Sequence, residues 1–255
     1  GDIWYDSGKF YLGTSQSFAG VWSSGGNLAT GRRLLAGAGT QSAGLCMGGY
    51  IDSAQDVTEE YDGTSWSSGG NLATARYALA GAGTQSAGLC MGGTTGASYS
   101  AVTEEYDGSA WSSGGNLATA RRNLAGAGTQ TAGLCMGGTT GSVSDVTEEY
   151  DGTSWSGGGN LATARSGLAG AGTQSAGLCM GGTTGSVSDV TEEYDGTSWS
   201  GEGSLATARS SLAGCGTQSA GLCMGGHDGS VSNATEEYTT GTGSYDELFT
   251  ASQGL

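Results

Sequence analysis

A tryptophan that recurs every 44 or 45 residues is the feature that most restricts the fold of this chain. The sequence between successive copies is nearly constant: W-S-S-G-G-N-L-A-T-A-R-x-x-L-A-G-A-G-T-Q-S-A-G-L-C-M-G-G, then a loop, then V-T-E-E-Y-D-G-T-S. A repeat of this length is one structural unit that buries its apolar face against its neighbours. The chain is therefore a repeat array, and its five copies begin at Trp22, Trp66, Trp111, Trp155 and Trp199.

Each repeat contains four short runs that predict β-strands. In the second unit they cover residues 79–85, 87–93 and 102–108, followed by the stretch around Trp111. Val, Tyr, Trp and Thr favour strands, and the glycines between the runs favour turns. A helix is not expected, because no segment keeps a helical period and glycine costs about 1 kcal/mol at each helical position. Four strands in one repeat match the size of a β-propeller blade.

The order of landmarks within the unit resembles the kelch repeat. A double glycine closes an apolar strand (CMGG), a Y-D-G turn and a Trp follow, and an Arg comes ten residues after the Trp, as in Trp66 and Arg76. The resemblance covers residues 20–239 and implies a β-propeller whose blades place their first strand nearest the axis. Two features depart from it: AGAG replaces the usual bulky inner strand, and five units are fewer than in most kelch propellers. The Y-D-G-T-S-W segment is also similar to the Asp box of sialidase-type propellers.

We therefore predict an all-β, five-bladed, kelch-like β-propeller of four-stranded antiparallel blades. Small residues in the inner strand let the backbones of neighbouring blades approach closely around a narrow axis. The fifth unit lacks a Trp strand, so we expect the N-terminal segment Ser17–Gly26 to complete that blade and close the ring. Residues 1–16 then form an N-terminal segment that continues from a larger parent chain, residues 17–239 the propeller, and residues 240–255 a C-terminal tail. An open stack of β-layers and a sixth partial blade made of KFYLG and the tail are the alternatives.

The charge of the chain restricts its partners. The chain has 24 acidic and 8 basic residues and a net charge of −16. Nucleic acids and anionic membrane surfaces would be repelled, so neither is an expected partner. No apolar run approaches the length of a membrane span, and the N-terminal GDIWYDSGKFYLG lacks the pattern of a signal peptide.

Cysteines fall at one position of every repeat, in the apolar strand before the double glycine. Such equivalent positions indicate separate blade cores rather than a disulfide framework, so we expect buried free thiols and folding in a reducing cytoplasm. A bridge between Cys215 and Cys223 on adjacent strands, or a metal site, is the alternative. The five repeat cysteines are Cys46, Cys90, Cys135, Cys179 and Cys223.

Paired glutamates and single arginines recur in the same way. Neighbouring strand residues point to opposite faces, so the two carboxylates of a pair do not converge into a catalytic dyad. We predict instead a structural Arg–Glu contact in each repeat. The arginines are Arg32, Arg76, Arg121, Arg165 and Arg209, and the pairs are Glu59/Glu60, Glu104/Glu105, Glu148/Glu149, Glu192/Glu193 and Glu236/Glu237.

No catalytic or cofactor site is expected. The single histidine, His227, supports neither a zinc site nor a Ser-His-Asp arrangement. Calcium bound at Asp56, Asp145 and Asp189 is a weaker alternative, because no EF-hand spacing is present. We therefore expect no metal, no cofactor and no enzyme activity.

The positions where the repeats differ indicate a candidate ligand site. The repeats vary in the loop after the double glycine and in the two residues after the Arg. In an up-down blade both positions emerge at the same end, where binding residues of rigid scaffolds usually lie. Neutral drift at exposed positions is the alternative. The candidate ligand-binding residues are Tyr50, Tyr77, Tyr99, Arg33, Arg122, His227 and Asp228.

These observations favour a binding module. Gly/Ser/Thr-rich arrays of this style resemble repeat regions of phage tail-fibre and virion-surface proteins, which implies recognition of a host-surface glycan or protein by a homo-oligomeric fibre. The expected location is a virion or an extracellular surface. The alternatives are a structural or decoration propeller without a ligand and, less favoured, a propeller enzyme of the sialidase or galactose-oxidase type. The latter needs paired copper-ligating histidines that one His cannot supply.

Overall fold

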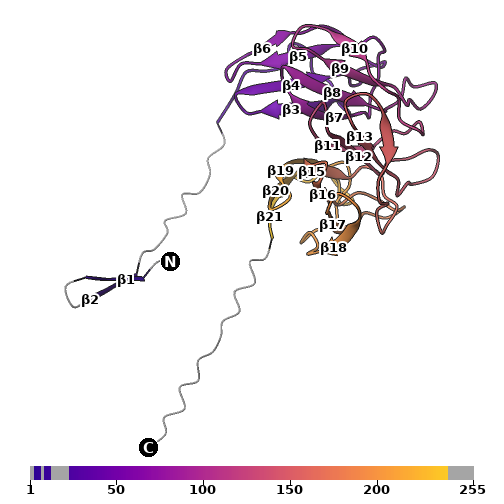
Figure 1. Cartoon of the computed structure of the whole chain (residues 1–255). Helices are drawn as coiled ribbons and strands as arrows, with labels where there is room; N and C mark the ends of the chain where they lie inside the picture. Colours follow the sequence, from indigo (N-terminus) through magenta and orange to yellow (C-terminus); the bar gives the residue numbers. More distant parts are fainter. Residues whose placement is uncertain (1–2, 7–8, 13–22, 241–255) are drawn as a thin grey trace, which may run out of the picture.

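The described residues of the computed structural model are 3–6, 9–12 and 23–240, and all their regular elements are strands. Residues 23–240 form five antiparallel sheets, which follow one another in sequence order (Figure 1). The first four sheets have four strands each and the fifth has three. The predicted all-β, five-bladed propeller is confirmed.

Every blade repeats the same strand order from the axis outward. The inner strands are β3 (Ala36–Thr40), β7 (Ala80–Thr84), β11 (Ala125–Gly128), β15 (Ala169–Thr173) and β19 (Ala213–Thr217). The second strands are β4 (Ala43–Met47), β8 (Ala87–Met91), β12 (Gly133–Met136), β16 (Ala176–Met180) and β20 (Ala220–Met224). The third strands are β5 (Thr58–Tyr61), β9 (Thr103–Tyr106), β13 (Thr147–Tyr150), β17 (Thr191–Tyr194) and β21 (Thr235–Thr239). The outer strands are β6 (Trp66–Ser68), β10 (Trp111–Ser113), β14 (Trp155–Gly157) and β18 (Trp199–Glu202).

The glycines of the inner strands allow the blades to pack closely around the axis. A Cβ on Gly81 would lie 2.6 Å from the carbonyl oxygen of Gly37 in the preceding blade. A Cβ on Gly126 would likewise lie 2.7 Å from the carbonyl oxygen of Gly81. Real Cβ atoms do not approach oxygen this closely, so the AGAG sequence is required by the spacing of the blades.

The hydrophobic core lies between blades rather than within one sheet. Between the second and third blades, Leu89 and Met91 pack with Leu124, Cys135 and Tyr150, and all five are at most 6% exposed. In the first four blades the Tyr of the third strand also pairs with the Trp of the outer strand, as in Tyr106 and Trp111, whose ring centroids are 4.9 Å apart. Each blade is therefore stabilised by contact with the next.

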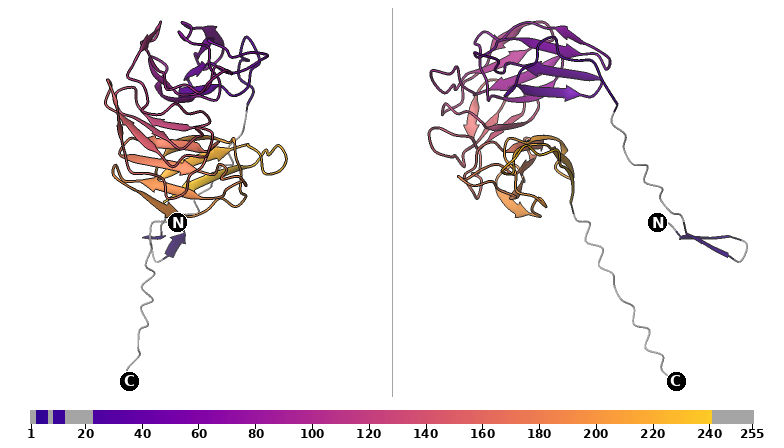
Figure 2. Two further views of the ribbon diagram at one scale, coloured as in Figure 1. Left: turned by 90° about the vertical axis from the view of Figure 1, so that its right-hand side faces the viewer. Right: turned by 180° about the vertical axis from the view of Figure 1, so that it is seen from behind.

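The two ends of the array differ from its middle. Inner strands of consecutive blades lie side by side, but no comparable contact joins β19 to β3, and the two end blades lie apart (Figures 1 and 2). Most of the predicted closing strand, residues 17–22, lies outside the described residues, and so does the tail from residue 241. The described hairpin of β1 (Ile3–Asp6) and β2 (Lys9–Leu12) pairs only with itself among the described strands.

Candidate functional site

The repeat arginines are buried in the blades and tie each connecting segment to its sheet. Arg76 Nη2 donates to Glu104 Oε1 at 2.8 Å and to Cys90 Sγ at 3.3 Å, and Nη1 donates to two backbone carbonyls. The second oxygen of Glu104 accepts a bond from the Ala73 amide at 2.6 Å. The same carboxylate therefore holds both the arginine and the segment that carries it. The other pairs are Arg32–Glu59, Arg121–Glu148, Arg165–Glu192 and Arg209–Glu236.

The second glutamate of a pair accepts a hydrogen bond from a tyrosine of the next blade instead. Glu105 Oε1 accepts a hydrogen bond from the Tyr150 hydroxyl of the next blade at 2.5 Å, while its neighbour Glu104 lies in its own blade core. The carboxylates of Glu104 and Glu105 thus point to opposite sides of the strand and make separate contacts, one within the blade and one with the next blade.

The cysteines are buried and unreactive, with one exception. All six are free thiols, and only Cys215 is exposed. Burial raises the pKa of the Cys90 thiol to about 11, so its nucleophilic thiolate form is rare at neutral pH. The alternative of a Cys215–Cys223 bridge is wrong, because Cys215 lies opposite Leu222 in the ladder and both thiols are free.

The two variable positions of the repeat lie side by side in every blade. The residue after the repeat arginine forms an antiparallel bridge with the residue after the double glycine, as in Arg33 with Tyr50. The same bridge joins Tyr77 to Thr94, and Arg122 to Thr139. The variation of the repeats is therefore gathered on one face of the propeller, as the up-down topology predicts.

Five of the seven candidate residues form an aromatic and cationic surface across the first three blades, here named the Arg–Tyr patch. Tyr50 and Tyr77 make an edge contact with ring centroids 4.8 Å apart. The guanidinium carbon of Arg33 lies 5.4 Å from the centre of the Tyr50 ring, and that of Arg122 lies 5.1 Å from the centre of the Tyr99 ring. Both are cation–π distances, so the stacking holds the two guanidinium groups in place.

The Arg–Tyr patch is continuous through the second blade. Thr94 bridges to Tyr77 on one side and to Tyr99 on the other. The Thr94 hydroxyl donates to the carbonyl of Ser98 at 2.8 Å, which fixes the loop that carries Tyr99. The backbone that carries the two tyrosines is thus joined by these bridges and by the Thr94–Ser98 hydrogen bond.

The remaining two candidates, His227 and Asp228, lie on the fifth blade and do not join the patch. His227 is exposed, and its Nδ1 accepts a bond from the Gly229 amide at 3.2 Å. Hydrogen bonds from the backbone and side chain of Ser230 lower the pKa of Asp228. Both side chains thus accept hydrogen bonds from residues of their own turn.

A row of left-handed residues runs from blade to blade beside the axis, and sequence reasoning did not single it out. The amide of Ala78 donates to the carbonyl of Leu34 at 2.8 Å, and that of Asn123 donates to Ala78 at 2.9 Å. The ladder continues through Gly167 to Ser211. These five residues, here named the axial ring, all have φ between 53° and 61°. The Asn and Gly at this repeat position were the sequence signal for a left-handed conformation.

The residues of the axial ring line the rim of a hollow between the inner ends of the blades. The leucine that follows each of them, such as Leu79 after Ala78, forms its apolar wall. Left-handed conformation costs free energy for residues with a Cβ, and it often marks positions that serve binding. Residues that line the hollow directly follow residues of the Arg–Tyr patch in the sequence: Leu34 follows Arg33, and Ala78 follows Tyr77.

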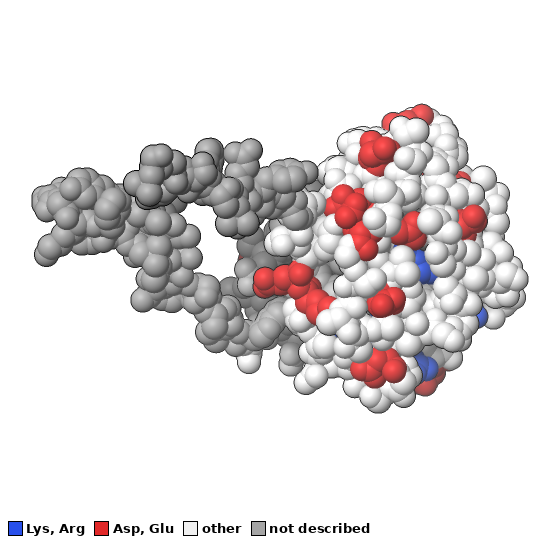
Figure 3. All heavy atoms as spheres, turned by 90° about the horizontal axis from the view of Figure 1, so that it is seen from below, with Lys and Arg blue, Asp and Glu red and all other residues white. Residues whose placement is uncertain are grey.

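Arg33 and Arg122 of the Arg–Tyr patch lie on a surface that carries many acidic and few basic side chains. Acidic side chains are spread over the face shown in Figure 3, and basic atoms appear at few points. Apart from the five buried repeat arginines, Arg33 and Arg122 are the only Lys or Arg residues between 23 and 240. No carboxylate pairs with either of them in the described part of the chain, and the buried Nε of Arg122 has no hydrogen-bond partner there. Arg33 is exposed and Arg122 is partly exposed.

Metal and membrane features are not found in the described part of the chain. In residues 3–6, 9–12 and 23–240 no group of His, Cys, Asp or Glu side chains is arranged to hold a metal ion, and Asp56, Asp145 and Asp189 form no such group. Within the same ranges no helix could cross a membrane.

Comparison with known proteins supports the fold alone. No protein-family model and no curated protein sequence matches this chain. The solved structure of YjhT is similar to it, with a TM-score of 0.76 and 13% sequence identity, over 90% of this chain and 88% of that one. At this identity the likeness extends to the propeller architecture and not to a shared activity.

Proposed function

We propose that this chain is a non-catalytic binding module and that the Arg–Tyr patch is its recognition site. The observation that carries the proposal is the stacking of the only two surface arginines of residues 23–240 on Tyr50 and Tyr99. Charged groups held against aromatic rings, on a rigid scaffold, are pre-organised for a ligand.

A glycan is the ligand class that best fits this chemistry. Tyr50, Tyr77 and Tyr99 offer ring faces and hydroxyls, and the guanidinium groups donate to hydroxyl or carboxylate oxygens. The net charge of −16 opposes a polyanion. A glycan of neutral sugars, or one with isolated carboxylates, therefore fits better than a heavily sulfated polymer.

The context of the module is part of the same proposal. The order of double glycine, Tyr and Trp supports a kelch-type propeller, and the Gly/Ser/Thr-rich repeats support a place on a virion surface or a tail fibre. In that setting the partner is a glycan or protein of the host surface.

A glycan array tests the proposal, with the repeats themselves supplying the control. Tyr77→Ser replaces the patch tyrosine with the residue that the fourth repeat carries at this position, Ser166. Loss of binding with an unchanged melting temperature is expected, and Tyr99→Ala is expected to act in the same way. Ser210→Ala, at the matching position before the fifth blade, is expected to bind as the unmodified chain does.

Two results would contradict the recognition site. Equal binding by Tyr77→Ser, Tyr99→Ala and the unmodified chain would place the ligand elsewhere. No binding to any glycan or host-surface protein, combined with ordered packing against another virion component, would support a structural or decoration role instead.

A further inference from the structure

The hollow between the inner ends of the blades has an apolar wall that is the same in every repeat. Its volume is about 290 Å³, and each blade contributes the leucine that follows its axial-ring residue. The leucines of the second to fifth blades are 5–7% exposed, because the remainder of each side chain packs in a core between blades. The wall is therefore the uncovered end of the hydrophobic core, and it consists of Leu35, Leu79, Leu124, Leu168 and Leu212.

The rim of the hollow differs in every blade, although the wall does not. Leu34 presents an apolar side chain that is 44% exposed, Asn123 a partly exposed amide and Ser211 an exposed hydroxyl. The ladder between blades uses the backbone groups of these residues, so their side chains remain outside it. A ligand at the rim would therefore contact side chains that do not hold the blades together.

Four of the five rim residues keep a side chain where glycine would cost less. Leu34, Ala78, Asn123 and Ser211 have φ between 53° and 56°, a conformation that glycine adopts without strain. The fourth repeat has glycine at this position, Gly167, so the fold accepts it. Strained residues of this kind cluster at binding sites, and variation confined to the rim favours contact with a ligand over a packing role.

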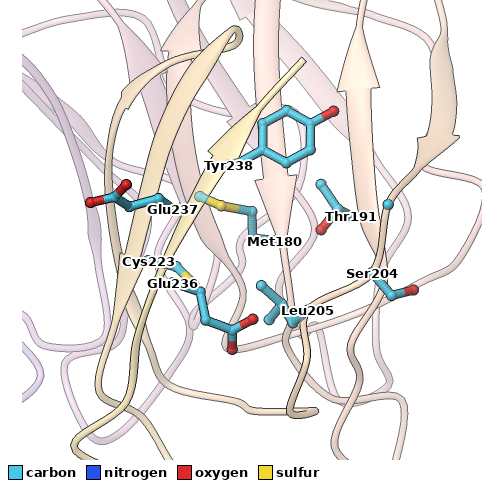
Figure 4. A pocket seen from close by; sticks show the side chains of 9 residues that line it. Met180, Thr191, Ser204, Leu205, Cys223, Glu236, Glu237 and Tyr238 are labelled. Carbon is cyan, nitrogen blue, oxygen red and sulfur yellow. The ribbon is translucent and has the colours of Figure 1, made fainter. Parts of the chain in front are cut away.

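The slot beside β21 is a different kind of space. Its lining includes Met180, Leu205, Cys223 and Tyr238 (Figure 4). The same residue types stand at the equivalent positions of the preceding blade, where they form a hydrophobic core with Trp199. The slot therefore belongs to the core of a blade, and its lining does not vary among the repeats as the rim of the hollow does.

The hollow and the Arg–Tyr patch are adjacent over the first three blades. The Cα atoms of neighbouring residues are about 3.8 Å apart, so a patch residue and the rim residue that follows it lie at neighbouring backbone positions. A ligand on the patch therefore has the rim within one residue of the groups that bind it. The three neighbouring pairs are Arg33–Leu34, Tyr77–Ala78 and Arg122–Asn123.

The chemistry of the hollow favours an acyl group. Leucine methyl groups favour a hydrocarbon chain, and a charged group or a hydroxyl would lose its hydration against them without compensation. The Asn123 amide can donate a hydrogen bond to an oxygen at the rim. An acyl group combines both features, a short hydrocarbon chain and one carbonyl oxygen. The volume of the hollow is close to the lower end of the about 300–1,000 Å³ of small-molecule pockets, so it fits a substituent rather than a whole sugar chain.

We propose that the hollow binds an acyl substituent of the glycan held by the Arg–Tyr patch, which makes an acylated glycan the ligand class of this module. The sugar contacts the patch tyrosines, the acyl chain lies against the leucine wall and Leu34, and the Asn123 amide donates to the acyl carbonyl oxygen. This inference rests on the proposed function and adds the chemical group that the ligand carries.

Matched pairs of glycans on an array test this chemistry. One member carries an acetyl or butanoyl ester and the other a free hydroxyl at the same carbon of an otherwise identical glycan. The acylated member is expected to bind at least about tenfold more tightly, as for a hydrocarbon group in an apolar pocket. Asn123→Gly is expected to lower this preference, whereas Ser211→Gly is the control and is expected to keep it, because Ser211 follows no patch residue. Both variants introduce the residue that the fourth repeat carries, so both are expected to melt as the unmodified chain does.

NMR of leucine methyl groups locates the acyl chain. The probes are the best-bound acylated glycan of the array and its free-hydroxyl partner. The acylated glycan is expected to shift the methyl signals of Leu79 and Leu124, and the free-hydroxyl partner is expected to leave them in place. Leu134 and Leu178, which are 0% exposed on the second strands, are the control and are expected to stay unchanged with both glycans.

The outcomes separate a failure of the acyl site from a failure of the proposed function. Equal binding of both members of every pair, lost in Tyr77→Ser, would overturn the acyl site and leave the recognition site intact. Unshifted Leu79 and Leu124 signals in a saturated complex would place the acyl group outside the hollow. An acyl preference equal in Asn123→Gly and Ser211→Gly would do the same. Binding of no glycan at all would overturn both proposals.

Discussion

The hydroxyl of Tyr106 donates a 2.5 Å hydrogen bond to Glu60 across the boundary between the second and first blades. The bond joins a fully buried tyrosine to a partly buried carboxylate. Because it is charge-assisted and repeats at each described boundary, the stability of the propeller depends strongly on contacts between blades.

Tyr106→Phe removes this bond while keeping the ring that packs against Trp111. The variant is expected to lower the free energy of unfolding by about 1.5–3 kcal/mol, the usual value of a hydrogen bond to a charged group. Urea unfolding followed by tryptophan fluorescence measures the change. Tyr99→Phe, which alters an Arg–Tyr patch tyrosine instead, is the control and is expected to have little effect. Equal stabilities of the two variants would contradict the role of the bond.

Arg121→Met leaves the carboxylate of Glu148 buried without its partner. The cost is expected to be about 3–5 kcal/mol, and the double variant Arg121→Met/Glu148→Leu is expected to recover a large part of it. Thermal and urea unfolding of the single and double variants measure this difference. Arg122→Ala, at the adjacent surface position, should unfold as the unmodified chain does. A double variant no more stable than Arg121→Met would argue against the buried pair as the cause.

Alkaline pH is expected to destabilise the fold through the buried tyrosines. Burial, together with the bond to Glu60, raises the pKa of Tyr106 from its ordinary value of 10.0 to about 12, and Tyr150 and Tyr194 behave alike. Above pH 10 the unfolded chain loses these protons while the folded chain keeps them, so stability falls as pH rises towards 12. The thiols add a loss of the same sign from about pH 9, since burial raises the pKa of Cys90 from 9.0 to about 11.

Denaturant titrations at a series of pH values measure this decline. Tyr106→Phe is expected to make it shallower, because one of the raised pKa values is removed. A stability that stays constant between the ordinary tyrosine pKa and the raised one would contradict the prediction.

Gly126→Val tests the close approach of the inner strands. The new side chain would overlap the Gly81 carbonyl, so a loss of at least about 1–3 kcal/mol is expected. Gly201→Ala, where a Cβ would meet no atom within 4 Å, is the control and should leave the melting temperature unchanged. Similar melting temperatures for the two variants would refute a steric need for glycine in the inner strands.

The repeat spacing predicted the blades well, because each strand is bounded by its own glycines. The run 87–93 contains β8 (Ala87–Met91), and the run 102–108 contains β9 (Thr103–Tyr106). The small residues of the inner strand were predicted from the AGAG sequence. The position of the variable residues on one face was predicted from the up-down topology. All of these depend on residues close together in the sequence.

Features that depend on a neighbouring blade were not predictable in the same way. The sequence indicated a Glu pair, but not that Glu105 bonds to Tyr150 of the next blade. The sequence grouped His227 with the tyrosines, although His227 lies on the fifth blade and Tyr50 on the first, because sequence alone does not measure the distance between blades. The left-handed axial ring was also missed, since Leu34 and Ser211 give no local sign of it.

The ladder that links Leu34, Ala78, Asn123, Gly167 and Ser211 is made by backbone atoms alone. No side chain takes part in these bonds, so a mutation here changes the chemistry of the axial opening without removing a contact between blades. Proline is excluded, because it has no amide hydrogen and a fixed negative φ, and β-branched residues tolerate the left-handed conformation worst among residues with a Cβ. Each blade therefore has one position at the axis that can diversify independently of the others, and a lineage carrying this propeller can change what it presents there one codon at a time.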